Sequence, residues 1–164
     1  MMARAKKKVT KKTTKKAKIS RKQIHEELVT NMRAWQKVEN ASVASTGRVM
    51  EKTDNPIIRL VMEIIQRDSQ MHYLVQGWIA DSLERKSVTL TPEELGRVWS
   101  LIEAHIKLEK KTIDIAKKAL DAIGNAKGMQ VQAYLLQYLM EDEEKHDRLL
   151  ERLAAIQKGM YPYG

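Results

Sequence analysis

Apolar residues recur at steps of three and four along four long segments of this 164-residue chain. That spacing is the period of an amphipathic helix, and no stretch alternates in the manner of a strand. The sequence predicts helices over about residues 20–52, 56–84, 92–123 and 129–158. The apolar stripes include Ile24, Leu28 and Met32 in the first segment, Ile58, Val61 and Ile65 in the second, Leu95, Val98 and Ile102 in the third, and Val131, Leu135 and Leu139 in the fourth.

Helix boundaries are marked by a few capping residues. Asn55 precedes Pro56, and Thr91 begins a Thr-Pro-Glu-Glu capping box. Gly124 and Gly159 end the third and fourth segments. The connection over residues 85–91 is too short, at about 3.5 Å per residue, to run back along a helix of roughly 45 Å. The sequence therefore predicts an all-α four-helix bundle, built from two pseudo-symmetric helical hairpins with a short middle connection.

Ionisable residues interrupt each apolar stripe near the middle of its helix. A charge on a core-facing position is costly unless it is paired or coordinates something. Counted from the turns, these positions lie at similar depths, so we expect them to meet in one layer of the bundle. They are Glu39 in the first segment, Asp68 and His72 in the second, His105 and Glu109 in the third, and Asp142, Glu143 and His146 in the fourth.

The same positions form an internal repeat. Residues 35–39 align with residues 105–109 at an offset of 70, and residues 68–72 align with residues 142–146 at an offset of 74. The repeat is weak residue by residue but consistent in spacing. It predicts two hairpins of common design.

The motif Glu143-x-x-His146 on the fourth segment, with single glutamates on the first and third and His72 on the second, resembles the ferritin-like superfamily and its rubrerythrin-like branch over residues 24–157. The resemblance implies a di-iron or di-manganese carboxylate site that handles ferrous iron or peroxide, with ferroxidase- or peroxidase-type chemistry. The implied metal ligands are Glu39, His72, Glu109, Glu143 and His146.

Ser69 stands where the second helix would carry the glutamate of a second Glu-x-x-His motif. Asp68 and Asp142 are therefore expected as further ligands or as partners that orient the histidines, and His105 and Ser69 as residues beside the ligands. We expect one or two ions per chain, of iron or manganese. The alternative is a metal-free network of buried carboxylates and histidines that fixes the helix register.

Composition narrows the class of protein. The absence of cysteine excludes a disulfide scaffold, a thiolate zinc site and a cysteine-ligated iron–sulfur cluster. No apolar run reaches the ~18–20 residues that span a bilayer, and no secretory signal begins the chain, so we expect a cytoplasmic protein. The predicted organisation is a lysine-rich tail over 1–20, the bundle over 21–158 and a short extension over 159–164.

Charge is concentrated at the N-terminus. The chain carries a net charge of +9, and residues 1–22 hold eleven lysines and arginines without one acidic residue. Such a tail can bind DNA or RNA without sequence preference by displacing counterions, as in a nucleoid-associated protein with the bundle as scaffold. An anionic membrane surface, a targeting role or a simply solvated tail are the alternatives, and a homodimer or larger homo-oligomer is left open. The candidate nucleic-acid-binding residues are Lys6, Lys7, Lys8, Lys11, Lys12, Lys15, Lys16, Lys18, Arg21 and Lys22.

Overall fold

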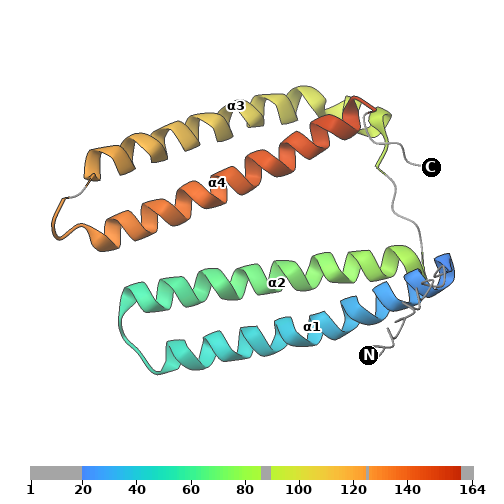
Figure 1. Ribbon diagram of the computed structural model, residues 1–164, viewed down its shortest axis with the longest axis horizontal. Helices are drawn as coiled ribbons and strands as arrows, with labels where there is room; N and C mark the ends of the chain where they lie inside the picture. Colours follow the sequence, from blue (N-terminus) through green and yellow to red (C-terminus); the bar gives the residue numbers. More distant parts are fainter. Residues whose placement is uncertain (1–19, 86–89, 125, 160–164) are drawn as a thin grey trace, which may run out of the picture. The chain divides into compact units, whose positions relative to one another are not determined.

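Four α-helices make up the protein in a computed structural model that describes residues 20–85, 90–124 and 126–159. They are α1 (Arg21–Glu51), α2 (Pro56–Glu84), α3 (Pro92–Ile123) and α4 (Gln130–Gln157) (Figure 1). No strand occurs within the described ranges. The predicted all-α class and the four helices are confirmed, and each boundary falls within about one residue of its predicted place.

The first two helices begin at side-chain caps. Ser20 Oγ accepts a hydrogen bond from the backbone N–H of Gln23, whose own side chain accepts one from the Ser20 N–H. This is a capping box that the sequence analysis did not single out. At the start of α2, the Asn55 carboxamide oxygen accepts from two backbone N–H groups, and Pro56 occupies the first helical position.

The second pair of helices is bounded in the same way. The predicted capping box between Thr91 and Glu94 is present, with Thr91 Oγ1 accepting from the Glu94 N–H at 3.2 Å. The turn that follows α3 uses Gly124 at φ 48° and Gly128 at φ 83°, a backbone region in which a side chain is strained. The predicted turn therefore rests on the glycines that the sequence places there.

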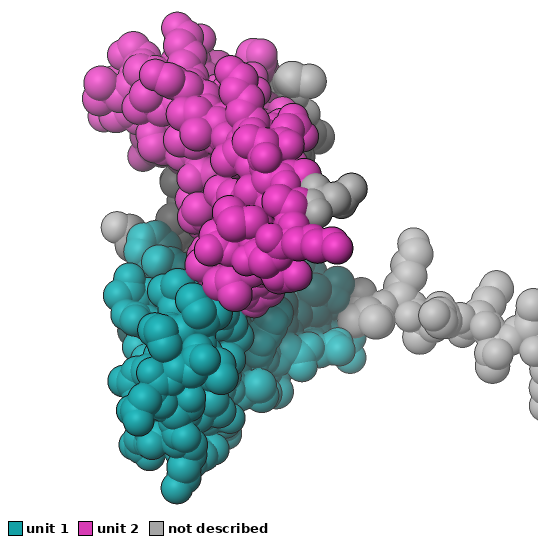
Figure 2. Space-filling model, turned by 90° about the vertical axis from the view of Figure 1, so that its left-hand side faces the viewer, with its two compact units in different colours: residues 1–88 teal, residues 89–164 magenta. Residues whose placement is uncertain are grey.

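The chain divides into two compact units, residues 1–88 and 89–164, each of which is a helical hairpin (Figure 2). We call them the first and the second hairpin. In the first, α1 packs along α2, and in the second, α3 packs along α4 (Figure 1). The connection between the hairpins covers residues 85–91, as predicted, and its residues 86–89 lie outside the described part of the chain.

The two hairpins bury different kinds of side chain. Among the described residues of the second hairpin, those that are buried are apolar except for Glu109. In the first hairpin, polar side chains outnumber apolar ones at buried positions. The buried residues are Met32, Gln36, Glu39, Thr46, Ser69, Gln76 and Ala80 in the first hairpin, and Leu95, Glu109, Ile113 and Ala116 in the second.

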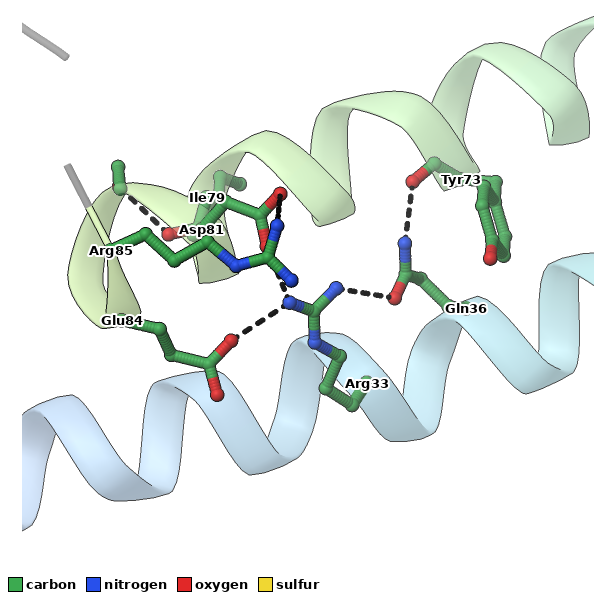
Figure 3. A network of polar contacts seen from close by, with 8 residues as sticks. Arg33, Gln36, Tyr73, Ile79, Asp81, Glu84 and Arg85 are labelled. Atoms are coloured by element: carbon green, nitrogen blue, oxygen red, sulfur yellow. Dashed lines mark hydrogen bonds and ion pairs between the residues drawn. The ribbon is translucent and has the colours of Figure 1, made fainter. Parts of the chain in front are cut away.

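An arginine joins the two helices of the first hairpin near the start of α1 (Figure 3). Arg33 Nη2 donates to Asp81 Oδ1 at 2.5 Å and to Glu84 Oε2 at 2.8 Å, and its Nη1 donates to Gln36 Oε1 at 3.1 Å. Gln36 Nε2 in turn donates to the backbone carbonyl of Tyr73 at 3.0 Å. The hydrogen bond from Arg33 lowers the pKa of Asp81 below its usual value. The network ties the N-terminal part of α1 to the C-terminal part of α2.

In the parts of the chain that the structure describes, no helix combines the length and the apolar character needed to cross a membrane.

Candidate metal centre

Three predicted ligands meet between the helices of the second hairpin. Glu109 comes from α3, and Glu143 and His146 come from one face of α4, where a three-residue spacing places them side by side. One ligand atom from each of the three lies within 4.8 Å of the others. His146 Nδ1 is 3.5 Å from Glu109 Oε2 and 3.8 Å from Glu143 Oε2. Three oxygen and nitrogen donors therefore surround one point.

Neighbouring side chains hold these three groups in place. His105 Nε2 lies 2.9 Å from Glu109 Oε1, one helical turn away on α3. Thr112 Oγ1 donates to Glu143 Oε2 at 3.0 Å. On the far side of the imidazole, Asp142 Oδ2 lies 3.7 Å from His146 Nε2. This leaves Nδ1 of His146 to face the carboxylates.

The two glutamates of the cluster differ in pKa, and Glu109 holds a proton to higher pH than Glu143 does. A proton on Glu109 can donate a hydrogen bond to Glu143, and this bond, together with burial, raises the pKa of Glu109 above its usual value. The same bond lowers the pKa of Glu143. When Glu109 is ionised, its Oε2 is buried without a hydrogen-bond donor among the described residues. A metal ion could be held by this pair of carboxylates together with His146.

The cluster opens into a surface hollow of about 410 Å³. A hydrated ion can therefore reach the donors, and water can complete a coordination shell that three side chains leave open. The hollow is lined by His105, Glu109, His146, Leu149 and Leu150.

The first hairpin repeats part of this arrangement. Glu39 of α1 is buried, and its Oε1 lies 3.5 Å from His72 Nδ1, the distance that separates Glu109 from His146. Ser69, which aligns with Glu143, donates a hydrogen bond from its Oγ to Ser42 Oγ at 2.9 Å. Ser42 aligns with Thr112, the partner of Glu143, so the hydroxyl contact of the second hairpin has a counterpart in the first.

The remaining candidates lie at different places. Asp68 is exposed on α2. Arg21 and Lys22 lie in the first turn of α1, where Lys22 is 3.7 Å from Glu26. The lysines from Lys6 to Lys18 lie outside the described residues. The structure thus brings together five predicted residues in the second hairpin, which are His105, Glu109, Asp142, Glu143 and His146, and two in the first, which are Glu39 and His72.

Two residues of the cluster's surroundings were missed. Thr112 and Ser42 carry no charge, so a pattern made of ionisable residues on apolar stripes does not include them. The offset of 70 would have found them, because it aligns hydroxyl with hydroxyl one turn after each glutamate.

Comparison of the chain with models of protein families, with curated proteins and with solved structures finds no match. The fold and the cluster define an all-α protein of two helical hairpins, the second of which carries a carboxylate–histidine group that could hold a metal ion. The four-helix content is compatible with a ferritin-like bundle.

Proposed function

We propose that this protein binds a divalent transition-metal ion on its second hairpin through Glu109, Glu143 and His146. The observation that carries the proposal is the buried Oε2 of Glu109, which lies near an imidazole nitrogen and a second carboxylate. When Glu109 is ionised, this oxygen has no hydrogen-bond donor among the described residues. Around an ion with bonds of about 2.1 Å, neighbouring ligand atoms stand about 3 Å apart. Small side-chain movements would bring the three donors to that spacing.

The chemistry of the donors favours iron or manganese. Two carboxylate oxygens and one imidazole nitrogen suit ions of intermediate hardness, and the chain has no thiolate to select softer ones. Asp142 Oδ2 lies 3.7 Å from His146 Nε2, and Thr112 holds one oxygen of Glu143 by a hydrogen bond. A redox-active ion with open coordination positions would supply electron transfer to oxygen or peroxide. We therefore propose the handling of ferrous iron or peroxide as the activity.

Metal content after anaerobic loading tests the binding. The full-length protein is incubated with ferrous iron or Mn²⁺, desalted and analysed for metal per chain, alongside Glu143→Gln and His146→Gln. Glu144→Gln is the matched control, because Glu144 is adjacent on α4 and its ion pair is with Arg148 at 3.9 Å. We expect both cluster variants to lose the ion of the second hairpin and the control to keep it.

Admission of oxygen to the iron-loaded protein then tests the activity. Oxidation that is faster than in buffer, and that is lost in Glu143→Gln but kept in Glu144→Gln, would support it. Equal metal content in all variants, with circular dichroism showing the same helix content, would refute the proposed site.

A second candidate function rests on the charge of residues 1–22, which hold eleven basic residues and no acidic one. We propose that this segment binds nucleic acid non-specifically. Removal of residues 1–19 should abolish salt-dependent DNA and RNA binding and leave the metal content of the second hairpin unchanged. Nucleic-acid binding that persists at the same salt dependence after the deletion would refute this role.

A further inference from the structure

The first hairpin buries a glutamine that has an unpartnered oxygen. Gln76 of α2 is 3% exposed, and its Nε2 donates to Glu39 Oε1 at 3.1 Å. Its Oε1 is buried and has no hydrogen-bond partner among the described residues. A buried carbonyl left in this state costs about 1–3 kcal/mol, so the residue at this position needs an explanation.

The internal repeat shows what this glutamine replaces. At the offset of 74, Ser69 aligns with Glu143 and Gln76 aligns with Leu150. The second hairpin therefore has a carboxylate, a potential metal ligand, three residues before its histidine and an apolar residue four residues after it. In the first hairpin a short serine stands at the first of these positions and the amide of Gln76 at the second. Positions three before and four after a residue both lie on its own helix face, so Gln76 places a side-chain oxygen near His72 although Ser69 has no carboxylate.

The other buried or partly buried glutamines of this hairpin do not share this feature. Gln36 accepts from Arg33 and donates to the Tyr73 carbonyl, so both ends of its amide are bonded. Gln66 donates to the carbonyl of Val43 at 3.1 Å. Neither of them contacts a carboxylate in these bonds. Gln76 differs because its amide lies against the buried Glu39.

From these contacts, we propose that the first hairpin holds a second divalent cation on Glu39, His72 and the amide oxygen of Gln76. This inference extends the proposed function to a second site, and it assigns to Gln76 the role that a glutamate at position 69 would have had. The amide of Gln76 and the imidazole of His72 both lie beside the same carboxylate oxygen: Glu39 Oε1 is 3.1 Å from Gln76 Nε2 and 3.5 Å from His72 Nδ1. Those separations are near the ~3 Å expected between ligands of one ion.

A half-turn of the amide connects the two states of the site. Without a cation, the N–H group of Gln76 faces the negative charge of Glu39. A bound cation reverses the sign of the charge that the amide meets, and rotation of the amide plane places Oε1 where Nε2 was. The buried oxygen then gains a partner. Because this set carries one carboxylate and the set of the second hairpin carries two, we expect the first site to be weaker by roughly tenfold or more.

The test isolates the first hairpin in the full-length chain. Glu143→Gln and His146→Gln are combined to remove the second site, and Mn²⁺ binding is measured by equilibrium dialysis. In the same samples, the imidazole proton signals of His72 are followed by NMR, because paramagnetic Mn²⁺ broadens the signals of a ligand first. We expect about one Mn²⁺ per chain to remain, with His72 broadened before His25.

Variants at position 76 then separate a ligand from a structural amide. Gln76→Leu copies Leu150, the residue that the second hairpin tolerates, and should weaken Mn²⁺ binding at least tenfold while raising the melting temperature of the metal-free protein. Gln76→Glu should tighten binding. Gln66→Met, which copies Met140 at the offset of 74, is the matched control and should leave Mn²⁺ binding unchanged.

Each other result overturns a stated claim. If Gln76→Leu binds Mn²⁺ as tightly as its parent, the amide is not a ligand. If the combined variant binds nothing while the natural chain binds one ion, the first hairpin has no site and the proposed function of the second stands. If the combined variant keeps every ion of the natural chain, the proposed site of the second hairpin is refuted instead.

Discussion

A transplant of the ligand set from the second hairpin to the first gives the sharpest test of the repeat. Ser69→Glu combined with Gln76→Leu gives α2 the residues that α4 has at the aligned positions, Glu143 and Leu150. A surface hollow of about 250 Å³ beside Ser69 leaves room for the longer side chain. Ser42 can donate to the new carboxylate as Thr112 does to Glu143, so the hydrogen bond between Ser42 and Ser69 is replaced and not simply lost. The experiment is done with Glu143→Gln and His146→Gln, so that only the first hairpin can respond.

Metal should reverse the effect of this transplant on stability. Without metal, a second carboxylate beside the buried Glu39 costs about 1–2 kcal/mol, since it must be desolvated next to a like charge. A metal ion present at a hundred times its dissociation constant stabilises the folded state by about 2.7 kcal/mol. For a unit of this size each kcal/mol moves the melting temperature by roughly 4–8 °C. The transplant should therefore melt roughly 5–15 °C below the variant that combines Ser69→Ala with Gln76→Leu in EDTA, and its melting temperature should rise by roughly 10–20 °C with Mn²⁺.

The assay is thermal unfolding followed by circular dichroism at 222 nm, with EDTA and with excess Mn²⁺. Ser69→Ala combined with Gln76→Leu is the control, because it makes the same deletions without adding a carboxylate. The control should show little response to Mn²⁺. If Mn²⁺ raises the melting temperature of the transplant no more than that of the control, the two hairpins do not share a metal-binding design, and the argument from the repeat fails.

Three further outcomes follow from individual contacts. Replacing Arg33 by Met should lower the melting temperature at pH 7, and the difference from the natural chain should shrink as pH falls below 3.8. The hydrogen bond from Arg33 lowers the pKa of Asp81 in the folded state, so its stabilisation is complete above the pKa of the unfolded state and is lost as pH falls through the pKa of the folded state. A difference in melting temperature that does not depend on pH would contradict this. Metal affinity, measured by competition with a chelator, should fall as pH falls through the raised pKa of Glu109, because the ion must displace that proton; an affinity flat between pH 7 and 4 would contradict it. Gly77→Ala should change the free energy of unfolding little, because a gain of about 1 kcal/mol in helix propensity is offset where the new Cβ meets Gln36 Nε2 at 3.0 Å. With Gln36→Ala the same change should stabilise by about 1 kcal/mol, and a double-mutant cycle in urea checks the coupling.

Helix positions were predictable because each boundary has a local chemical cause. The Asn55-Pro56 pair and the Thr91 capping box fix their helix starts by contacts within three residues, so no tertiary information was needed. Ser20 and Gln23 form an equally local box, and the Ser-x-x-Gln spacing would have found it. The Arg33 network could not be found in this way, since its partner Asp81 is 48 residues away in the sequence, on the other helix of the hairpin.

The candidate site was predictable to the extent that it uses ionisable residues on apolar stripes. Glu109, Glu143 and His146 stand out because a charge at such a position needs a partner, and the structure places the three together. Gln76 did not stand out, because an amide in a helix face raises no electrostatic question by itself. Only its contact with Glu39, and the oxygen left unpartnered, give it meaning.

Three buried or half-buried glutamines of the first hairpin align with half-buried apolar residues of the second. Gln36, Gln66 and Gln76 align with Ile106, Met140 and Leu150. Stability alone would favour the apolar residues, because a buried amide needs an acceptor for its N–H groups and a donor for its oxygen. Gln76 has no donor for its oxygen among the described residues. Gln36 and Gln66 repay their burial through bonds to backbone carbonyls between the helices, which fixes helix register. Gln76 bonds instead to the Glu39 carboxylate of the other helix, and its own oxygen is left without a hydrogen-bond partner among the described residues. A bound cation is the partner that our proposal gives to this oxygen, so replacement of Gln76 by leucine should separate the stability of the fold from metal binding.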